Sequence, residues 1–109
     1  MDQPYYSTES LSGFVAASAH MILFTTGPGN NYVSLLAPTI KLSANAGTCA
    51  NLTEQIDFDA SPILTGTMGF AEATQMLLAR IAEVASGTAT FGEILSEGSE
   101  TISRCGESL

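Results

Sequence analysis

A strand-like run that ends in a glycine-rich turn is the stretch of this sequence best suited to binding a ligand. Met21-Ile22-Leu23-Phe24-Thr25-Thr26 is apolar and then hydroxylated, and Gly27-Pro28-Gly29-Asn30 follows it directly. Such a turn, at the carboxyl end of a strand, presents backbone N–H groups to anions in many α/β proteins. It lacks the Gly-Lys-Ser/Thr of a phosphate-binding loop, and only Gly27-x-Gly29 matches a dinucleotide-binding turn. Ligand binding and a purely structural turn are therefore both open.

Lys41 is the second candidate for chemistry, because it is the only lysine and lies within an apolar stretch. Thr39-Ile40-Lys41-Leu42-Ser43 alternates after a proline, which predicts a buried strand. A lysine there either pairs with a carboxylate, such as Asp57 or Asp59, or meets an anionic ligand. The sequence favours neither of these two alternatives over the other.

The remaining reactive residues do not form a recognisable catalytic set. Asp57 and Asp59 flank Phe58, so a strand would project both carboxylates from one face, but two carboxylates alone are a weak metal site. His20 is the only histidine, at a predicted helix–strand junction, where we expect a partly buried structural residue. No Ser-His-Asp order, HExxH or Cys-His arrangement is present. We therefore predict no metal site within this chain.

Charge and composition narrow the range of partners. The 109 residues contain eleven acidic and three basic side chains, for a net charge of −8, which argues against nucleic acid and against an anionic membrane surface. Only 13% of residues are charged, against about 25% in typical soluble domains, and 45% are hydrophobic. A surface with so few charges predicts that another protein segment or subunit covers one side of the domain. The chain is therefore expected to be a piece of a larger protein or a subunit of an oligomer.

The cysteines and the chain's N-terminal composition predict a cytoplasmic location. Cys49 and Cys105 lie far apart in the sequence without CxxC spacing, as expected of free thiols in a reducing compartment. Neither a signal peptide nor a membrane-spanning run is recognisable.

Strand-like and helix-like stretches alternate along the chain and predict one α/β domain over residues 1–109, with a small, mostly parallel sheet and flanking helices. In the first half of the chain we expect a helix from Ser7 to His20, a strand buried on both faces over 21–26, a loop over 27–38 and a strand over 39–43. In the second half we expect a short helix over 48–53, a strand over 55–59, a helix over about 70–86 and an edge strand over 100–105. Thr67 is a possible N-cap of the long helix. The long helix carries a broad apolar arc, which predicts packing on a sheet or on two neighbours. Too few helices are available to cover both faces of the sheet, so the chain is expected to be one part of a larger architecture.

Three segments in this order resemble a known enzyme family. Residues 19–30 (AHMILFTTGPGN), 37–45 (APTIKLSAN) and 56–60 (IDFDA) are similar to the C-terminal region of the altronate dehydratase and galactarate dehydratase family, which includes the large subunit of sulfolactate sulfo-lyase. The resemblance continues through the long helix to the terminal strand. Family members are much longer, so it covers only their last domain, a Rossmann-like α/β layer that would form part of a three-layer enzyme.

The resemblance implies an activity and a set of candidate residues. The family eliminates water or sulfite from a hydroxy acid, usually with ferrous iron, as a base removes the proton α to a carboxylate and a cation stabilises the enediolate. The family turn reads TTGRG, and here Pro28 replaces the arginine that would suit a sugar-acid carboxylate. The positions that do match give Gly27, Gly29, Asn30, Lys41 and Asn45 as candidate substrate-binding residues.

The leading hypothesis is thus the C-terminal domain of a sugar-acid hydro-lyase, inactive as an isolated chain. Its expected partners are the sugar-acid substrate, the remaining domains of the parent enzyme and further copies in a homo-oligomer. A non-catalytic assembly or dimerisation domain is the alternative, and a small anion-binding module is a third.

Overall fold

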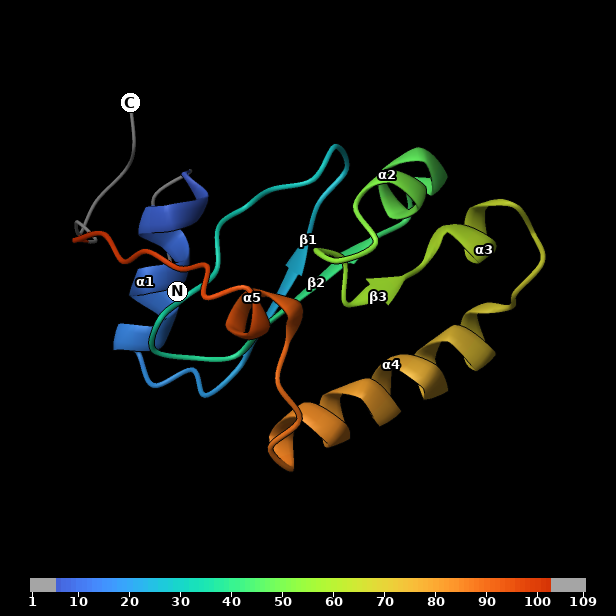
Figure 1. Ribbon diagram of the computed structural model, residues 1–109. Coiled ribbons are helices and arrows are strands. Elements are labelled where there is room, and N and C mark those ends of the chain that lie inside the picture. The colour runs from blue at the N-terminus through green and yellow to red at the C-terminus, as the bar shows by residue number, and fades with distance from the viewer. Residues whose placement is uncertain (1–5, 103–109) are drawn as a thin grey trace.

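Three parallel strands form the centre of the domain in the computed structural model, which describes residues 6–102. They are β1 (Ile22–Thr25), β2 (Thr39–Ser43) and β3 (Phe58–Asp59), in the order β1-β2-β3 (Figure 1). Ile22 lies opposite Thr39 in the first pair, and Leu42 lies opposite Phe58 in the second. The predicted α/β class with a small parallel sheet is confirmed.

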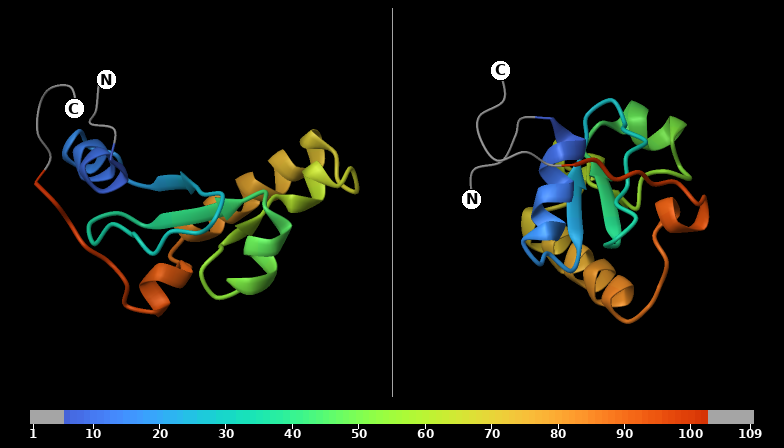
Figure 2. Two further views of the ribbon diagram at one scale, coloured as in Figure 1. Left: turned by 90° about the horizontal axis from the view of Figure 1, so that it is seen from above. Right: turned by 90° about the vertical axis from the view of Figure 1, so that its left-hand side faces the viewer.

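Helices flank this sheet on two sides. They are α1 (Ser7–Ala16), α2 (Ala46–Asn51), α3 (Ser61–Leu64), α4 (Phe70–Ala85) and α5 (Phe91–Ile94). The two views of Figure 2 place α1 and α4 on one side of the strands and α2 and α5 on the other. A loop over residues 26–38 joins β1 to β2, which suffices because a parallel crossover needs only about a dozen residues.

The hydrophobic core lies between α1, β1 and the loop that follows β1. Leu11, Ile22, Tyr32 and Ala37 are buried together, and the partly buried Phe24 packs against them. The rings of Phe24 and Tyr32 meet edge to face, with centroids 6.5 Å apart and planes at 87°. This geometry suits the opposite charge of ring edges and ring faces, and it fixes the long loop against the strand.

The first helix and the first strand differ from expectation. α1 ends at Ala16, not at His20, because Ser18 adopts the left-handed conformation (φ 72°) and turns the chain towards β1. His20 is exposed, and the expectation of a partly buried histidine was wrong. The strand is shorter than 21–26 and is covered on one face only, since Leu23 remains 48% exposed.

The boundaries of three later elements also needed correction. α2 begins at Ala46, because the side chain of Asn45 caps it, and does not begin at Thr48. β3 starts at Phe58 rather than at 55. Thr67 is not an N-cap: Gly69 holds that position, and the Thr67 hydroxyl donates to the carbonyl of Pro62 (3.3 Å).

The long helix, predicted over 70–86, is present, but its apolar arc is largely uncovered. Only Ala73 and Val84 are buried on α4, whereas Phe70, Met76 and Leu78 are exposed. No strand is found over 100–102, and the rest of the predicted edge strand, with Cys105, lies outside the described residues. Among residues 6–102, none of the helices is long and apolar enough to cross a membrane.

Candidate functional site

The carboxyl ends of all three strands open into one cleft of about 710 Å³, here called the carboxyl-edge cleft. This edge is where open parallel sheets bind their ligands, because loops diverge there and backbone groups are accessible. The lining comes from the ends of the three strands and from the starts of α2 and α3: Thr25, Thr26, Gly27, Leu42, Ser43, Ala44, Asn45, Ala46, Ala60, Ser61, Leu64 and Thr65.

Hydrogen bonds fix the glycine turn at the mouth of this cleft. The carbonyl of Gly27 accepts from the hydroxyl of Thr48 at 2.6 Å and from that of Ser43 at 3.4 Å. The hydroxyl of Thr26 accepts from the N–H of Gly29 at 3.1 Å. The turn is therefore tied both to β2 and to α2, so its shape does not depend on a ligand.

The two glycines of the turn have different roles. Gly27 lines the cleft, and a Cβ atom there would meet nothing within 4 Å. Gly29 adopts a φ of +99°, and a Cβ there would collide with the side chain of Leu52. Gly29 is thus required by the backbone, while Gly27 leaves open space beside the cleft.

Asn45 reaches the cleft from the start of α2. Its side-chain oxygen accepts from the N–H groups of Gly47 (3.0 Å) and Thr48 (3.2 Å), and its own N–H donates to the hydroxyl of Ser43 (3.2 Å). The residue is exposed and belongs to the lining. It therefore combines a helix cap with a polar side chain at the ligand-accessible edge.

Lys41 does not line the cleft; of its two alternatives the structure contains the pairing with a carboxylate, but the partner is Glu97 and not Asp57 or Asp59. Its side chain is fully buried, and the ammonium group lies 3.3 Å from Oε2 of Glu97 and 3.1 Å from the carbonyl oxygen of Asn30. Physically, β2 sends this side chain towards the loops beside α5, where Glu97 offers the carboxylate. The ammonium group is occupied by interactions within the chain.

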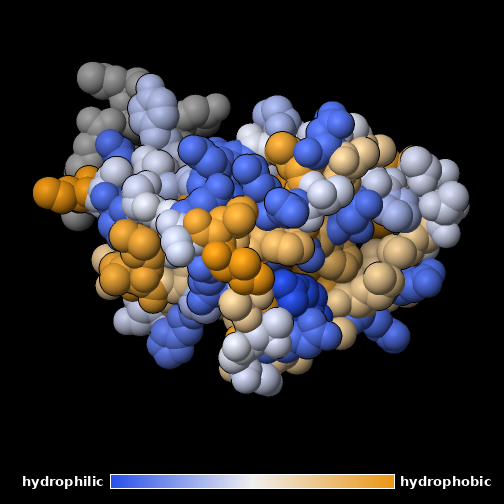
Figure 3. Space-filling model, viewed as in Figure 1, coloured by the Kyte–Doolittle hydropathy of each residue, from blue (hydrophilic) through white to orange (hydrophobic). Residues whose placement is uncertain are grey.

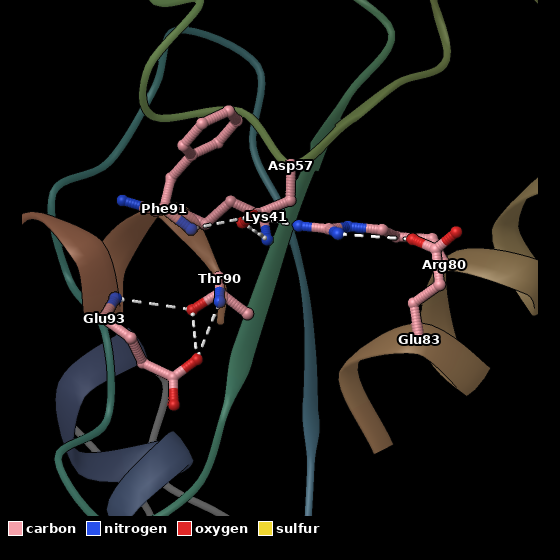
Figure 4. A network of polar contacts seen from close by, with 7 residues as sticks. All are labelled: Lys41, Asp57, Arg80, Glu83, Thr90, Phe91 and Glu93. Atoms are coloured by element: carbon pink, nitrogen blue, oxygen red, sulfur yellow. Dashed lines mark hydrogen bonds and ion pairs between the residues drawn. The ribbon is translucent and has the colours of Figure 1, made fainter. Parts of the chain in front are cut away.

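Asp57 instead joins backbone and side-chain groups from three directions (Figure 4). Its carboxylate accepts from the N–H of Lys41 at 2.9 Å and from that of Phe91 at 2.9 Å, and it pairs with Arg80 at 3.4 Å. The backbone N–H of Asp57 also donates to the carbonyl of Lys41 at 2.8 Å, so both the backbone and the side chain of Asp57 are tied to β2. Asp59, by contrast, accepts from the N–H of Ser61 at the start of α3, so the two carboxylates do not form one site.

Asn30 lies outside the cleft lining and makes contacts within the chain. Its side-chain oxygen accepts from the N–H of Tyr32 at 2.8 Å, a local turn, and its carbonyl faces Lys41. Of the five predicted site residues, the structure brings Gly27 and Asn45 to the cleft and leaves Gly29, Asn30 and Lys41 as its supports. The hydroxyls of Ser43, Ser61 and Thr65 are lining groups that the sequence did not single out.

The electrostatics of the cleft are those of uncharged hydrogen-bonding groups, since none of its lining residues carries a charge. Just behind it, burial tends to raise the pKa of Asp59, but hydrogen bonds from Ser61 outweigh this effect and lower the pKa below its ordinary value. Burial, together with the neighbouring carboxylate of Asp59, raises the pKa of the Cys49 thiol. Cys49 is a buried free cysteine, as predicted.

The donor set does not fit a ferrous ion. Iron in enzymes is held mainly by imidazole, carboxylate or thiolate groups, and the cleft offers hydroxyls and one amide. Over residues 6–102, no three His, Cys, Asp or Glu side chains are grouped to share a metal ion.

Comparison with known proteins identifies the family. A domain family described as "D-galactarate/Altronate dehydratase, C-terminal" matches residues 1–108, which is nearly the whole chain. The chain belongs to this family. The resemblance seen in the three sequence segments is thereby confirmed.

Two curated relatives of this chain are much longer proteins. The chain is 35% identical over 97 residues to the (2R)-sulfolactate sulfo-lyase subunit beta of Chromohalobacter salexigens, covering 89% of this chain and 24% of that protein. It is 30% identical over 93 residues to the altronate dehydratase of Escherichia coli K12, covering 85% of this chain and 18% of that protein. The dehydratase-family chain thus spans a quarter or less of the length of these relatives.

Proposed function

We propose that this chain is the C-terminal domain of a lyase that eliminates water or sulfite from a hydroxy acid, and that its carboxyl-edge cleft forms one wall of the substrate pocket. The observation that carries the proposal is the meeting of two residues that the sequence resemblance gave as candidates, Gly27 and Asn45, in the cleft where parallel sheets bind ligands. The names of the two relatives supply the chemical class, since one is a dehydratase and the other a sulfo-lyase.

The cleft is suited to a sugar acid's hydroxyl groups more than to its carboxylate. Thr25 and Asn45 are exposed and offer a hydroxyl and an amide group that donate to or accept from alcohols, and Gly27 lets a substrate approach the backbone. No lining side chain is cationic, and Pro28 stands where the sequence resemblance implies an arginine. The carboxylate of the substrate must therefore be bound by groups from other parts of the parent enzyme.

The elimination itself needs a base for the proton α to the carboxylate and a cation or acid for the developing charge. Neither group is present in the cleft lining, so the isolated chain is proposed to be inactive. Iron is proposed for the parent enzyme alone, because the residues of the cleft do not fit it.

A hydroxyl deletion tests this role in the full-length lyase. Thr25→Val removes an exposed hydroxyl at the end of β1 while keeping a β-branched side chain, and Thr88→Val makes the same change on an exposed residue outside the cleft. We expect Thr25→Val to lower kcat/KM about tenfold, the equivalent of one lost hydrogen bond, and Thr88→Val to leave it unchanged.

The assay should follow product from altronate, galactarate and sulfolactate in parallel, with the isolated chain measured beside the full-length enzyme. Equal kcat/KM for Thr25→Val and the wild type on the preferred acid would refute the role of the cleft. Robust turnover by the isolated chain would refute the need for other segments.

A further inference from the structure

One face of the domain carries an exposed apolar surface that the proposed substrate cleft does not use. Leu35 and Leu36 in the loop before β2, and Ile94 and Leu95 at α5, leave much of their surface in water, 72% for Leu36 and 64% for Ile94. We name these four residues the Leu36–Ile94 face. A groove of about 330 Å³ runs between the loop and α5, and apolar side chains gather over both in Figure 3.

The backbone beneath this face is held firmly, although its side chains are exposed. The carboxylate of Glu100 accepts from the hydroxyl of Ser34 at 2.5 Å and from the N–H of Leu35 at 2.9 Å. Leu35 lies so close to Gly98 that a Cβ there would collide with it. A binding surface that is ordered before it meets its partner loses less conformational entropy on binding, so this arrangement favours a docking role.

The charges around the face define the partner. Glu93 and Glu97 line the groove, and no lysine or arginine is among its lining residues. Lys41 lies beneath and offsets the charge of Glu97, so the exposed Glu93, together with the net charge of −8, makes this face negative. Two copies of a chain with net charge −8 would bring carboxylates against carboxylates here, whereas an apolar surface edged with Lys and Arg would be complementary.

We propose that the Leu36–Ile94 face docks onto the remaining part of the parent lyase, on a surface with an apolar centre and a basic rim. This inference rests on the proposed function, which makes the chain one domain of a larger enzyme. The lengths of the relatives agree with this proposal. The matched region is 24% of one relative and 18% of the other, so most of each relative lies outside this domain and can supply the docking surface.

Photo-crosslinking in the full-length lyase tests the docking. A benzophenone amino acid replaces Leu36 or Ile94, and the control replaces Asn51, an exposed polar residue at the end of α2 that does not line the groove. We expect the first two positions to crosslink to peptides outside the family-matched region and Asn51 to do so at least fivefold less. Crosslinks confined to a second copy of the matched region, or equal yields from all three positions, would overturn the proposal.

Two variants of Leu36 with opposite charges test the chemistry of the partner surface. With the crosslinker at Ile94, Leu36→Lys should lower the yield severalfold more than Leu36→Glu, because only lysine opposes a basic rim; the reverse order would overturn the stated chemistry of the partner. Both variants should melt within a few degrees of the wild type, since Leu36 is exposed. Crosslinks to the parent without lyase activity would refute the proposed function alone, and activity with crosslinks only between copies would refute the docking alone.

Discussion

The ammonium nitrogen of Lys41 lies 3.3 Å from Oε2 of Glu97, which connects the central strand to the segment after α5 across 56 residues of sequence. The lysine side chain is fully buried, and the glutamate side chain is 24% exposed. This pair turns the most suggestive cationic residue of the sequence into a structural one. The cleft is consequently left with neutral groups, and the acid substrate proposed for it needs a counter-charge from elsewhere in the parent enzyme.

Replacing this lysine should therefore affect stability first. Lys41→Met leaves Glu97 and the carbonyl of Asn30 without their donor, and we expect it to lower the free energy of unfolding by about 3 kcal/mol. Glu97→Gln leaves the fully buried ammonium group without its counter-charge and should also cost about 3 kcal/mol. Urea denaturation followed by circular dichroism measures both. A Lys41→Met chain with the wild-type midpoint would contradict the structural role of the pair.

The two glycines of the turn should respond differently to alanine. Gly29→Ala forces a Cβ against Leu52 at a φ of +99°, so we expect a loss of about 1–3 kcal/mol in unfolding free energy. Gly27→Ala places its methyl group in open space and should change stability by less than about 0.5 kcal/mol. Thermal melts of the two variants make the comparison, and equal shifts would show that the assigned division of roles is wrong.

Glu100 is expected to make the stability of the domain depend on pH. Burial tends to raise its pKa, but hydrogen bonds from Ser12 and Ser34 and from the N–H groups of Leu35 and Leu36 outweigh this and lower the pKa below the ordinary 4.5. A lowered folded-state pKa means that the ionised carboxylate stabilises the fold above pH 4.5, and that this stabilisation disappears as the pH falls through the folded value.

Glu100→Gln should accordingly be less stable than the wild type at pH 7, by about 1–2 kcal/mol for the weakened charged hydrogen bonds. The difference should shrink as the pH falls below 4.5 and vanish in more acidic solution. Urea titrations between pH 3 and pH 7 measure it, with Glu83→Gln on the exposed face of α4 as the control. A difference that stays constant over this range would contradict the assigned role of the carboxylate.

Local sequence signals predicted the elements that local physics determines. Alternation after Pro38 located β2, and the apolar stripe that ends at Gly87 located α4 to within a residue. β3 was predicted too long: the backbone N–H of Asp57 still donates to the carbonyl of Lys41 at 2.8 Å, but the regular strand pairing covers only Phe58 and Asp59. The uncovered Leu23 likewise depends on which elements pack beside β1, and not on the strand's own residues.

The candidate site was predicted only in part for the same reason. Gly27 and Asn45 follow strands directly, so their place at the carboxyl edge can be read from the order of elements. Lys41 could not be assigned, because its partner Glu97 comes from a distant segment and the sequence offered nearer carboxylates. Ser43 and Ser61 are short hydroxyl residues of a common kind, and only the convergence of two strand ends makes them part of a cleft.

The assignment of the cleft as a substrate wall is tested most directly by a charge placed at Asn45 in the full-length lyase. Aspartate caps helices as well as asparagine does, so Asn45→Asp should fold normally while it adds a negative charge to the cleft. Asn51→Asp makes the same change at the far end of α2, outside the cleft. The cleft assignment predicts that Asn45→Asp lowers kcat/KM for the acid substrate at least about tenfold, with Asn51→Asp unchanged; wild-type kcat/KM in a well-folded Asn45→Asp enzyme would contradict it.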